Sequence, residues 1–113
     1  AMQMQLQQQQ WDLVISDYSL PHFSAPEALK LLQSTGLDLP FIIVSGYIGE
    51  DAAVAAMKAG AHDYVMKDNF TRLVPAVERE LREAAVRRQT RLAEVAQRES
   101  EQRFRALIEN ATD

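Results

Sequence analysis

Short apolar runs alternate with longer amphipathic segments along the first part of the chain. DLVIS (12–16) and PFIIVSG (40–46) are almost continuously apolar, as strands buried on both faces are, and HDYVMK (62–67) is a third short strand. The segments APEALKLLQSTG (25–36) and GEDAAVAAMKAGA (49–61) have helical spacing and a glycine near the carboxyl end. Strands separated by single helices form parallel sheets through right-handed crossovers. The pattern therefore predicts an α/β fold.

A long helical pattern follows the third strand. It begins at Leu73 and continues to about Arg105 without glycine, and without proline after Pro75. Apolar residues recur at spacings of three and four, although Arg88 and Arg91 interrupt them: Val74, Val77, Leu81, Ala84, Leu92 and Val95. The spacing predicts one long C-terminal helix that pairs as a parallel two-helix coiled coil.

Composition narrows the possible functions. The chain has no cysteine, which excludes disulfides, thiolate catalysis and cysteine-based metal sites. The net charge of -4 argues against a nucleic-acid or anionic-membrane surface as the main partner. No apolar run approaches the ~20 residues of a membrane span, and we expect a soluble cytoplasmic protein. The glutamine-rich segment 1–10 is either low-complexity sequence or, as we favour, a short helix.

Polar side chains with complementary chemistry stand at the ends of the three predicted strands. Asp17, Ser45 and Lys67 follow the first, second and third apolar runs. Because functional groups gather at the carboxyl ends of parallel strands, these side chains should converge at one edge of the sheet. A carboxylate, a hydroxyl and an ammonium group suit phosphoryl transfer onto the carboxylate, with a divalent metal to neutralise charge.

The segments DLVISDYSLP, LPFIIVSG and AMKAGAHDYVMK, with the helix beyond them, resemble the second part of a two-component receiver domain over about residues 11–88. The resemblance implies a partial flavodoxin-like (CheY-like) fold with a short parallel sheet. It implies that Asp17 accepts a phosphoryl group from a histidine kinase or phosphotransfer protein, and that Ser45 and Lys67 bind the phosphoryl oxygens. Tyr64 would be the aromatic switch.

The resemblance also implies a Mg²⁺ site, with Asp17 and the backbone carbonyl of Ser19 as ligands. The family's acidic first strand is absent before Trp11, so we expect weak metal binding and impaired phosphorylation. The strand at 12–16 would then be an exposed edge, and a homodimer would form through that edge, the C-terminal helix, or both.

A second departure concerns the residue after Lys67. Family members usually have proline there, whereas this chain has Asp68. A cis bond before a non-proline residue costs roughly 2.5–4 kcal/mol. We therefore expect a trans bond and an altered loop.

Four segments are expected along the chain, and the last ten residues, FRALIENATD, resemble the start of a PAS domain. The segments are a glutamine-rich segment or helix remnant (1–10), a truncated receiver (11–85), a signalling helix (86–103) and the beginning of PAS (104–113). The predicted function is a phosphorelay receiver that signals through its last helix to an output domain, without enzymatic turnover. The alternative is a phosphorylation-independent dimerisation module that sets coiled-coil register.

Other interpretations are weaker. A lone aspartate at a strand end is more often a turn residue than a phospho-acceptor. The presence of Ser45 and Lys67 at the matching strand ends favours the acceptor role for Asp17. His22 and His62 fit neither a hydrolase nor a metal-ligand spacing, so we expect surface roles for both. The arginines of the last helix are a feature of RNA-binding helices, but interleaved glutamates weaken that interpretation.

Overall fold

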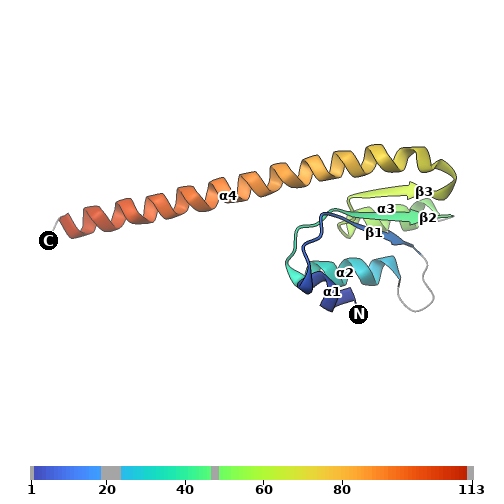
Figure 1. Ribbon diagram of the computed structural model, residues 1–113, viewed down its shortest axis with the longest axis horizontal. Coiled ribbons are helices and arrows are strands. Elements are labelled where there is room, and N and C mark those ends of the chain that lie inside the picture. The colour runs from blue at the N-terminus through green and yellow to red at the C-terminus, as the bar shows by residue number, and fades with distance from the viewer. Residues whose placement is uncertain (1, 19–23, 47–48, 112–113) are drawn as a thin grey trace.

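A computed structural model describes residues 2–18, 24–46 and 49–111 of the chain (Figure 1). Its centre is a parallel three-stranded sheet in the order β1-β2-β3. The strands are β1 (Val14–Asp17), β2 (Phe41–Ser45) and β3 (Asp63–Met66). All five residues of β2 are buried, as its continuous apolar run predicts for a strand between two neighbours. The predicted α/β fold with a short parallel sheet is confirmed.

Three helices pack on one face of the sheet: α1 (Met2–Gln8), α2 (Ala25–Thr35) and α3 (Glu50–Lys58). The main core lies on this face, where Phe41 and Ile43 of β2 pack with buried residues of all three helices. A short helix in the glutamine-rich segment is as expected, and its Leu6 contributes to the core.

The ends of α2 follow from its sequence. Ser24 and Glu27 form a reciprocal capping box at the amino end, with both hydrogen bonds at 3.4 Å. Gly36 ends the helix in the left-handed conformation at φ 76°, which glycine adopts without steric cost.

A single described helix, α4 (Leu73–Ala111), covers the opposite face of the sheet. The second core there is small and joins Ile42, Val65 and Ala76. Ile15 of β1 stays 47% exposed. Among the described residues, the outer edge of β1 has no strand beside it.

The connection between β3 and α4 is short and helical. A 3₁₀ helix, η1 (Lys67–Arg72), occupies it, with Asn69 at a non-helical φ of -133° and ψ of 51°. The bond between Lys67 and Asp68 is trans as expected, because the described residues contain no cis peptide bond. The short helix leads from Lys67 directly into α4.

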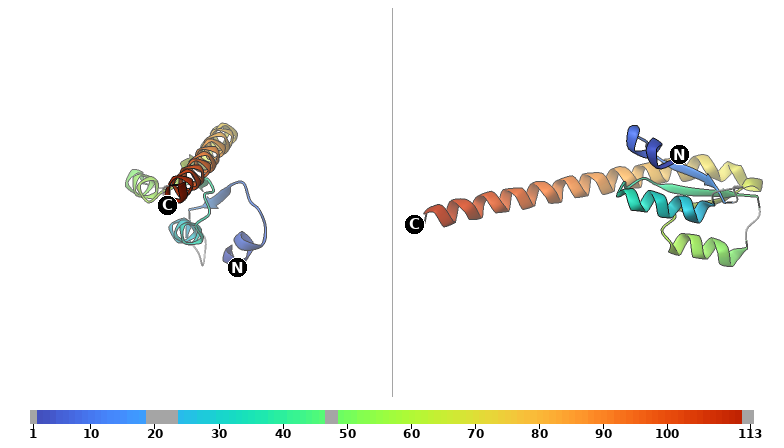
Figure 2. Two further views of the ribbon diagram at one scale, coloured as in Figure 1. Left: turned by 90° about the vertical axis from the view of Figure 1, so that its left-hand side faces the viewer. Right: turned by 90° about the horizontal axis from the view of Figure 1, so that it is seen from below.

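Helix α4 extends far beyond the sheet, and the molecule measures 68 × 29 × 27 Å (Figures 1 and 2). It has 39 residues and continues through the segment that resembles a PAS start, as far as Ala111. The predicted long C-terminal helix is confirmed, whereas its pairing as a coiled coil stays a prediction. None of the described helices is long and apolar enough to cross a membrane.

Candidate functional site

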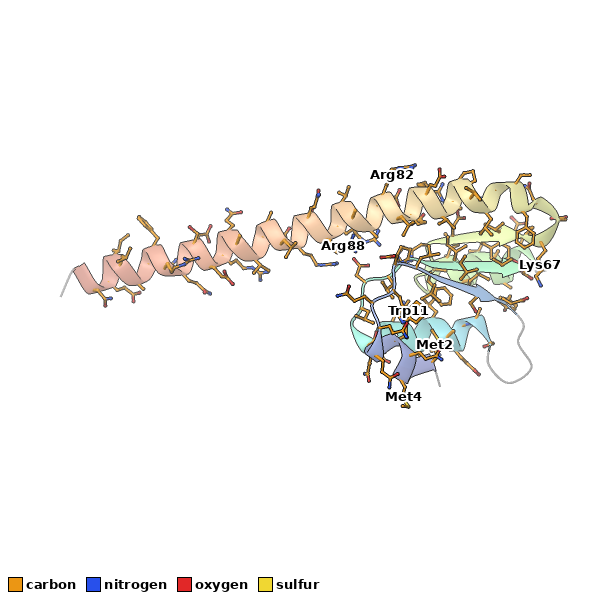
Figure 3. The ribbon with its side chains drawn as sticks, in the orientation of Figure 1. Met2, Met4, Trp11, Lys67, Arg82 and Arg88 are labelled. Carbon is orange, nitrogen blue, oxygen red and sulfur yellow. The ribbon has the colours of Figure 1, made fainter. Side chains whose placement is uncertain are left out.

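The carboxyl edge of the sheet brings two of the predicted residues into direct contact. Asp17 is the last residue of β1, and Lys67 follows the last residue of β3. The Lys67 Nζ atom lies 2.6 Å from Asp17 Oδ2, across the end of the central strand. Figure 3 shows Lys67 at this end of the sheet, opposite the end near Trp11 and Arg88. The predicted convergence of a carboxylate and an ammonium group is therefore present.

The Asp17–Lys67 ion pair is open to solvent, with side chains 34% and 45% exposed. Exposed pairs of this kind contribute only about 0–1 kcal/mol to stability. The pair is thus a weak reason for the fold to place these residues together. Its exposure does leave the carboxylate within reach of a soluble donor.

Ser45 ends β2, between the strands that carry Asp17 and Lys67. Its register partner on β3 is Met66, the residue before Lys67, and Asp17 pairs with Val44, the residue before Ser45. Ser45 is only 4% exposed. The three predicted residues therefore stand at consecutive strand ends, with the hydroxyl residue buried between the charged ones.

Gly46 follows Ser45 at the mouth of the site. A Cβ atom built on it would lie 3.9 Å from Lys67 Cδ, which is an ordinary van der Waals contact. A longer side chain at this position would lie against the Lys67 stem. Glycine at position 46 leaves no side chain against the Lys67 stem.

Tyr64, the predicted switch residue, lies on β3 three residues before Lys67. Its side chain packs against the main core on the α2 and α3 face. Its hydroxyl is buried and has no hydrogen-bond partner among the described residues. An unsatisfied buried hydroxyl costs about 1–3 kcal/mol of stability. Ser19 and His22 lie outside the described residues.

An ion-pair cluster at the start of β3 was not predicted. Asp63 is buried and accepts hydrogen bonds from Arg79 at 2.5 Å and from Arg72 at 3.4 Å. Its arginine partners follow within 16 residues and could have been inferred from the helix that begins at Leu73.

His62 has a structural role rather than the expected surface role. Its ring Nδ1 accepts a hydrogen bond from the Phe41 backbone N–H at 2.9 Å, and its own N–H donates to the Phe41 carbonyl at 2.8 Å. Both bonds extend the pairing of β2 and β3 beyond the ladder. The expectation was wrong because the backbone group that His62 satisfies is 21 residues away.

A second cluster joins α4 to the loop before β2. Asp38 accepts hydrogen bonds from Arg87 Nε at 3.1 Å and Arg91 Nη1 at 2.5 Å. Burial alone would raise the pKa of the Asp38 carboxyl, but the hydrogen bonds and positive charges of Arg87 and Arg91 outweigh it. The pKa therefore lies below its ordinary value of 3.8.

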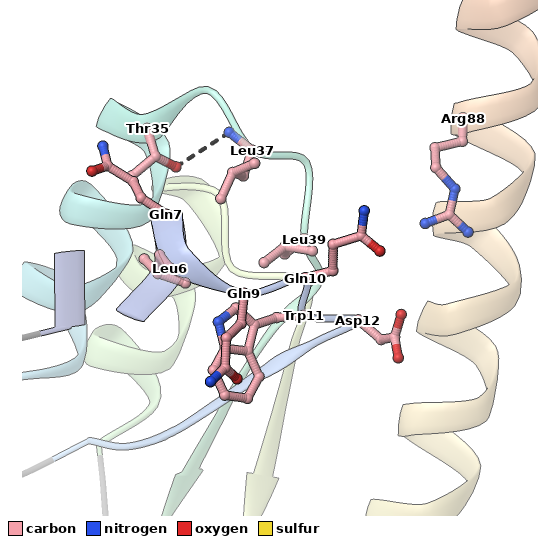
Figure 4. A pocket seen from close by; sticks show the side chains of 10 residues that line it. All are labelled: Leu6, Gln7, Gln9, Gln10, Trp11, Asp12, Thr35, Leu37, Leu39 and Arg88. Carbon is pink, nitrogen blue, oxygen red and sulfur yellow. Dashed lines mark hydrogen bonds between the residues drawn. The ribbon is translucent and has the colours of Figure 1, made fainter. Parts of the chain in front are cut away.

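A hollow of about 630 Å³ lies at the opposite end of the sheet from Asp17 (Figure 4). Leu6, Trp11, Leu39 and Arg88 are among its lining residues, which come from α1, the loops beside the sheet and α4. The indole N–H of Trp11 donates to the Gln5 carbonyl at 2.9 Å. This hollow shares no residue with the carboxyl-edge site.

A parallel sheet between helices, with an acidic residue at the carboxyl end of an outer strand, defines a flavodoxin-like α/β protein of the CheY-like kind. The comparisons with known proteins give the family. The family model of the response regulator receiver domain matches residues 1–78, and the chain belongs to this family.

Curated relatives are regulators of transcription. The chain is 38% identical over 72 residues to the transcriptional regulatory protein NatR of Bacillus subtilis, covering 63% of this chain and 30% of NatR. It is 34% identical over 68 residues to the transcriptional regulatory protein FixJ of Rhizobium meliloti, covering 59% and 33%. The chain thus spans about a third of the length of these relatives.

Solved structures of receivers have the same fold. Full-length FixJ from B. japonicum is 31% identical with a TM-score of 0.63, over 70% of this chain and 39% of that one. The receiver domain of a putative LuxO repressor from Vibrio parahaemolyticus is 24% identical with a TM-score of 0.72, over 79% and 69%. The second likeness shows the fold alone.

Receiver domains typically bind Mg²⁺ at the phosphorylation site. In the described part of this chain, no group of three or more histidine, aspartate or glutamate side chains could hold a metal ion. Asp17 Oδ2 is held by Lys67. The described residues do not form a Mg²⁺ site, and we derive no step through the metal.

Proposed function

We propose that this chain is a phosphorelay receiver in which Asp17 accepts a phosphoryl group from a phosphohistidine of a histidine kinase or phosphotransfer protein. The observation that carries the proposal is the 2.6 Å contact between Lys67 Nζ and Asp17 Oδ2 at the carboxyl edge of the sheet. Membership of the receiver family supports it.

In the proposed step, a carboxylate oxygen of Asp17 attacks phosphorus, the P–N bond to the histidine breaks, and an acyl phosphate forms. The electron pair of the broken bond stays on the imidazole. Lys67, already beside the carboxylate, then pairs with a phosphoryl oxygen, and the Ser45 hydroxyl donates a hydrogen bond to another. Both interactions neutralise or disperse the added negative charge.

Signal output is proposed to pass through α4. Lys67 opens η1, and η1 leads directly into α4, so a movement of Lys67 toward the phosphoryl group pulls on the connection to the helix. Tyr64 would follow Ser45, because its buried hydroxyl has no partner among the residues that the structure describes. The receiving domain would be a PAS or other output domain.

Phosphorylation of this chain should be slow. Lys67 supplies a positive charge beside Asp17, but no cluster of metal ligands surrounds Asp17 among the described residues. We expect slow labelling by acetyl phosphate that magnesium hardly accelerates, measured by intact-protein mass spectrometry.

The variant Asp17→Asn should take up no phosphoryl group, because its amide is not a nucleophile. Asp12→Asn is the matched control, since Asp12 is an exposed aspartate on the amino side of the same strand, and it should label like wild type. Absence of label on the wild type, or equal label on Asp17→Asn, would contradict the proposed acceptor role.

The second candidate is a dimerisation module that works without phosphate. The exposed Ile15 on the open edge of β1 and the long exposed part of α4 favour this alternative. Under it, Asp17→Asn would leave both the oligomeric state and the downstream output unchanged. A change of output in that variant supports the receiver proposal instead.

A further inference from the structure

The projecting half of α4 has one face without charge. Between residues 86 and 108 there are nine charged side chains, and they all lie on the rest of the helix surface when positions are placed at about 100° per residue. The residues on the free side form what we name the uncharged face: Val86, Gln89, Thr90, Ala93, Gln97, Ser100, Phe104, Leu107 and Ile108. All are exposed.

The uncharged face points away from the rest of the molecule. Ala76, Glu80 and Ala84 are buried toward the sheet, and Arg87 and Arg91 on the same side bind Asp38. The uncharged face is centred roughly 140° around the helix from these residues. Figure 3 shows Arg82, one turn before Val86 on that side, directed away from the sheet. A partner can therefore approach this face without meeting the globular part.

The composition of the face fits a second copy of the same helix. Ala93 and Ser100 are small and allow two helices to approach closely, whereas Phe104, Leu107 and Ile108 form an apolar cluster with exposures of 62%, 68% and 48%. In a parallel pair this cluster packs against its own equivalent and leaves water. Over 23 residues the contact is about 34 Å long.

The charges beside the face favour the parallel orientation. Glu94 and Glu101 flank it on one side, whereas Gln89, Ala96 and Arg103 lie toward the other. A parallel pair sets the acidic flank of one helix against the neutral and basic flank of the other. An antiparallel pair would place Glu94 of one copy beside Glu101 of the other, where like charges repel.

We propose that two copies of this chain associate in parallel through the uncharged face of α4, between Val86 and Ile108. The face differs from the seam of Leu92 and Val95 expected from the apolar spacing, since that seam meets Glu99 one turn later. The proposal concerns α4 alone and holds whether or not Asp17 accepts phosphate.

Light scattering and sedimentation equilibrium on the full chain test the proposal. Wild type should have twice the 12.7 kDa mass of the chain at tens of micromolar. Ala93→Glu places a charge in the proposed contact and should raise the dissociation constant roughly 100-fold, because two uncompensated carboxylates would be buried. Ala106→Glu makes the same change on another face of the helix and should leave the dissociation constant within about twofold.

The absence of native cysteine gives a test of orientation. Thr90→Cys should form a disulfide-linked dimer on oxidation, because a parallel pair sets residue 90 beside its equivalent. In an antiparallel pair over the same residues the two sites would be about 21 Å apart along the helix axis. A monomeric wild type, equal effects of Ala93→Glu and Ala106→Glu, a dimer that Ala93→Glu leaves intact, or no cross-link at Thr90→Cys would each overturn the proposal.

Discussion

At the scale of single residues, the buried hydroxyl of Tyr64 is a hydrogen-bonding group near the site that is left unsatisfied among the described residues. The ring belongs to the main core, but the polar atom at its end finds no partner among the described residues. Lys67, three residues later, is by contrast already engaged with Asp17. The site thus combines a charge pair with a neighbouring buried hydroxyl that has no partner among the described residues.

Removal of the Tyr64 hydroxyl should stabilise the fold. In Tyr64→Phe the ring still packs on the core while the unsatisfied oxygen is gone, so the free energy of unfolding in urea should rise by about 1 kcal/mol. Tyr18→Phe is the matched control, because the Tyr18 hydroxyl is not among the buried, unpartnered atoms of the described residues, and it should change stability by less than about 0.5 kcal/mol. A less stable Tyr64→Phe protein would mean that the hydroxyl has a partner.

The residues of the candidate site were predictable because each follows an apolar run. Asp17, Ser45 and Lys67 lie at or just after the strand ends. The parallel topology brings these strand ends to the same edge of the sheet. The roles of Asp63 and His62 were not, because they depend on groups that only the folded chain brings close. Sequence spacing marks an edge of a sheet, but it does not state which backbone group a side chain will satisfy.

At the scale of elements, the ends of α2 and the connection to α4 show the same division. Serine before the helix, glutamate three positions later and glycine after it are local signals, and the helix Ala25–Thr35 agrees with them. The 3₁₀ helix Lys67–Arg72 has no such signal, and the guanidinium of Arg72 bonds back to the Tyr64 carbonyl at 3.2 Å. The sequence alone does not predict this 3₁₀ helix, because the bond joins groups eight residues apart that only the folded chain brings together.

The cap of α2 should have a measurable effect on stability. Ser24→Ala removes the acceptor for the Glu27 backbone N–H and should lower the free energy of unfolding by about 1 kcal/mol, as judged by thermal and urea melts. Ser34→Ala changes the same residue type near the other end of α2, where the hydroxyl bonds only to the Leu31 carbonyl. It should cost less than about 0.5 kcal/mol, and an equal loss in both variants would speak against a specific capping effect.

At the scale of the whole molecule, α4 is attached to the globular part by a sheet-face core, by the ion pair of Arg79 with Asp63 and by the Asp38 cluster. Its first turns cover Ile42 and Val65 on one sheet face, and the Asp38 cluster holds it near Arg87 and Arg91. The sheet-face attachment begins where η1 ends. In the Asp38 cluster, Arg87 and Arg91 lie 49 and 53 residues after Asp38 in the chain. Such distant pairs have no local sequence signal, so the direction of the helix could not be predicted even though its length could.

The Asp38 cluster makes part of the stability dependent on pH. The pKa of Asp38 in the folded chain lies below its ordinary value of 3.8, so the unfolded chain binds the proton more tightly. The contribution of the cluster is therefore complete above about pH 5 and is lost as the pH falls through the lowered pKa. Asp38→Asn should cost roughly 0.5–1 kcal/mol at pH 7, as expected for partly exposed ion pairs.

The difference between wild type and Asp38→Asn should shrink toward zero near pH 2, where the wild-type carboxyl is protonated as well. Urea unfolding at pH 7, 5 and 3 measures this difference, and Asp68→Asn, an exposed aspartate in η1, is the control that should show no such pH dependence. A difference between wild type and Asp38→Asn that stays constant with pH would mean that the carboxylate charge does not hold α4. The small sheet-face core and the ion pair of Arg79 with Asp63 would then be the attachments that set the direction of the helix.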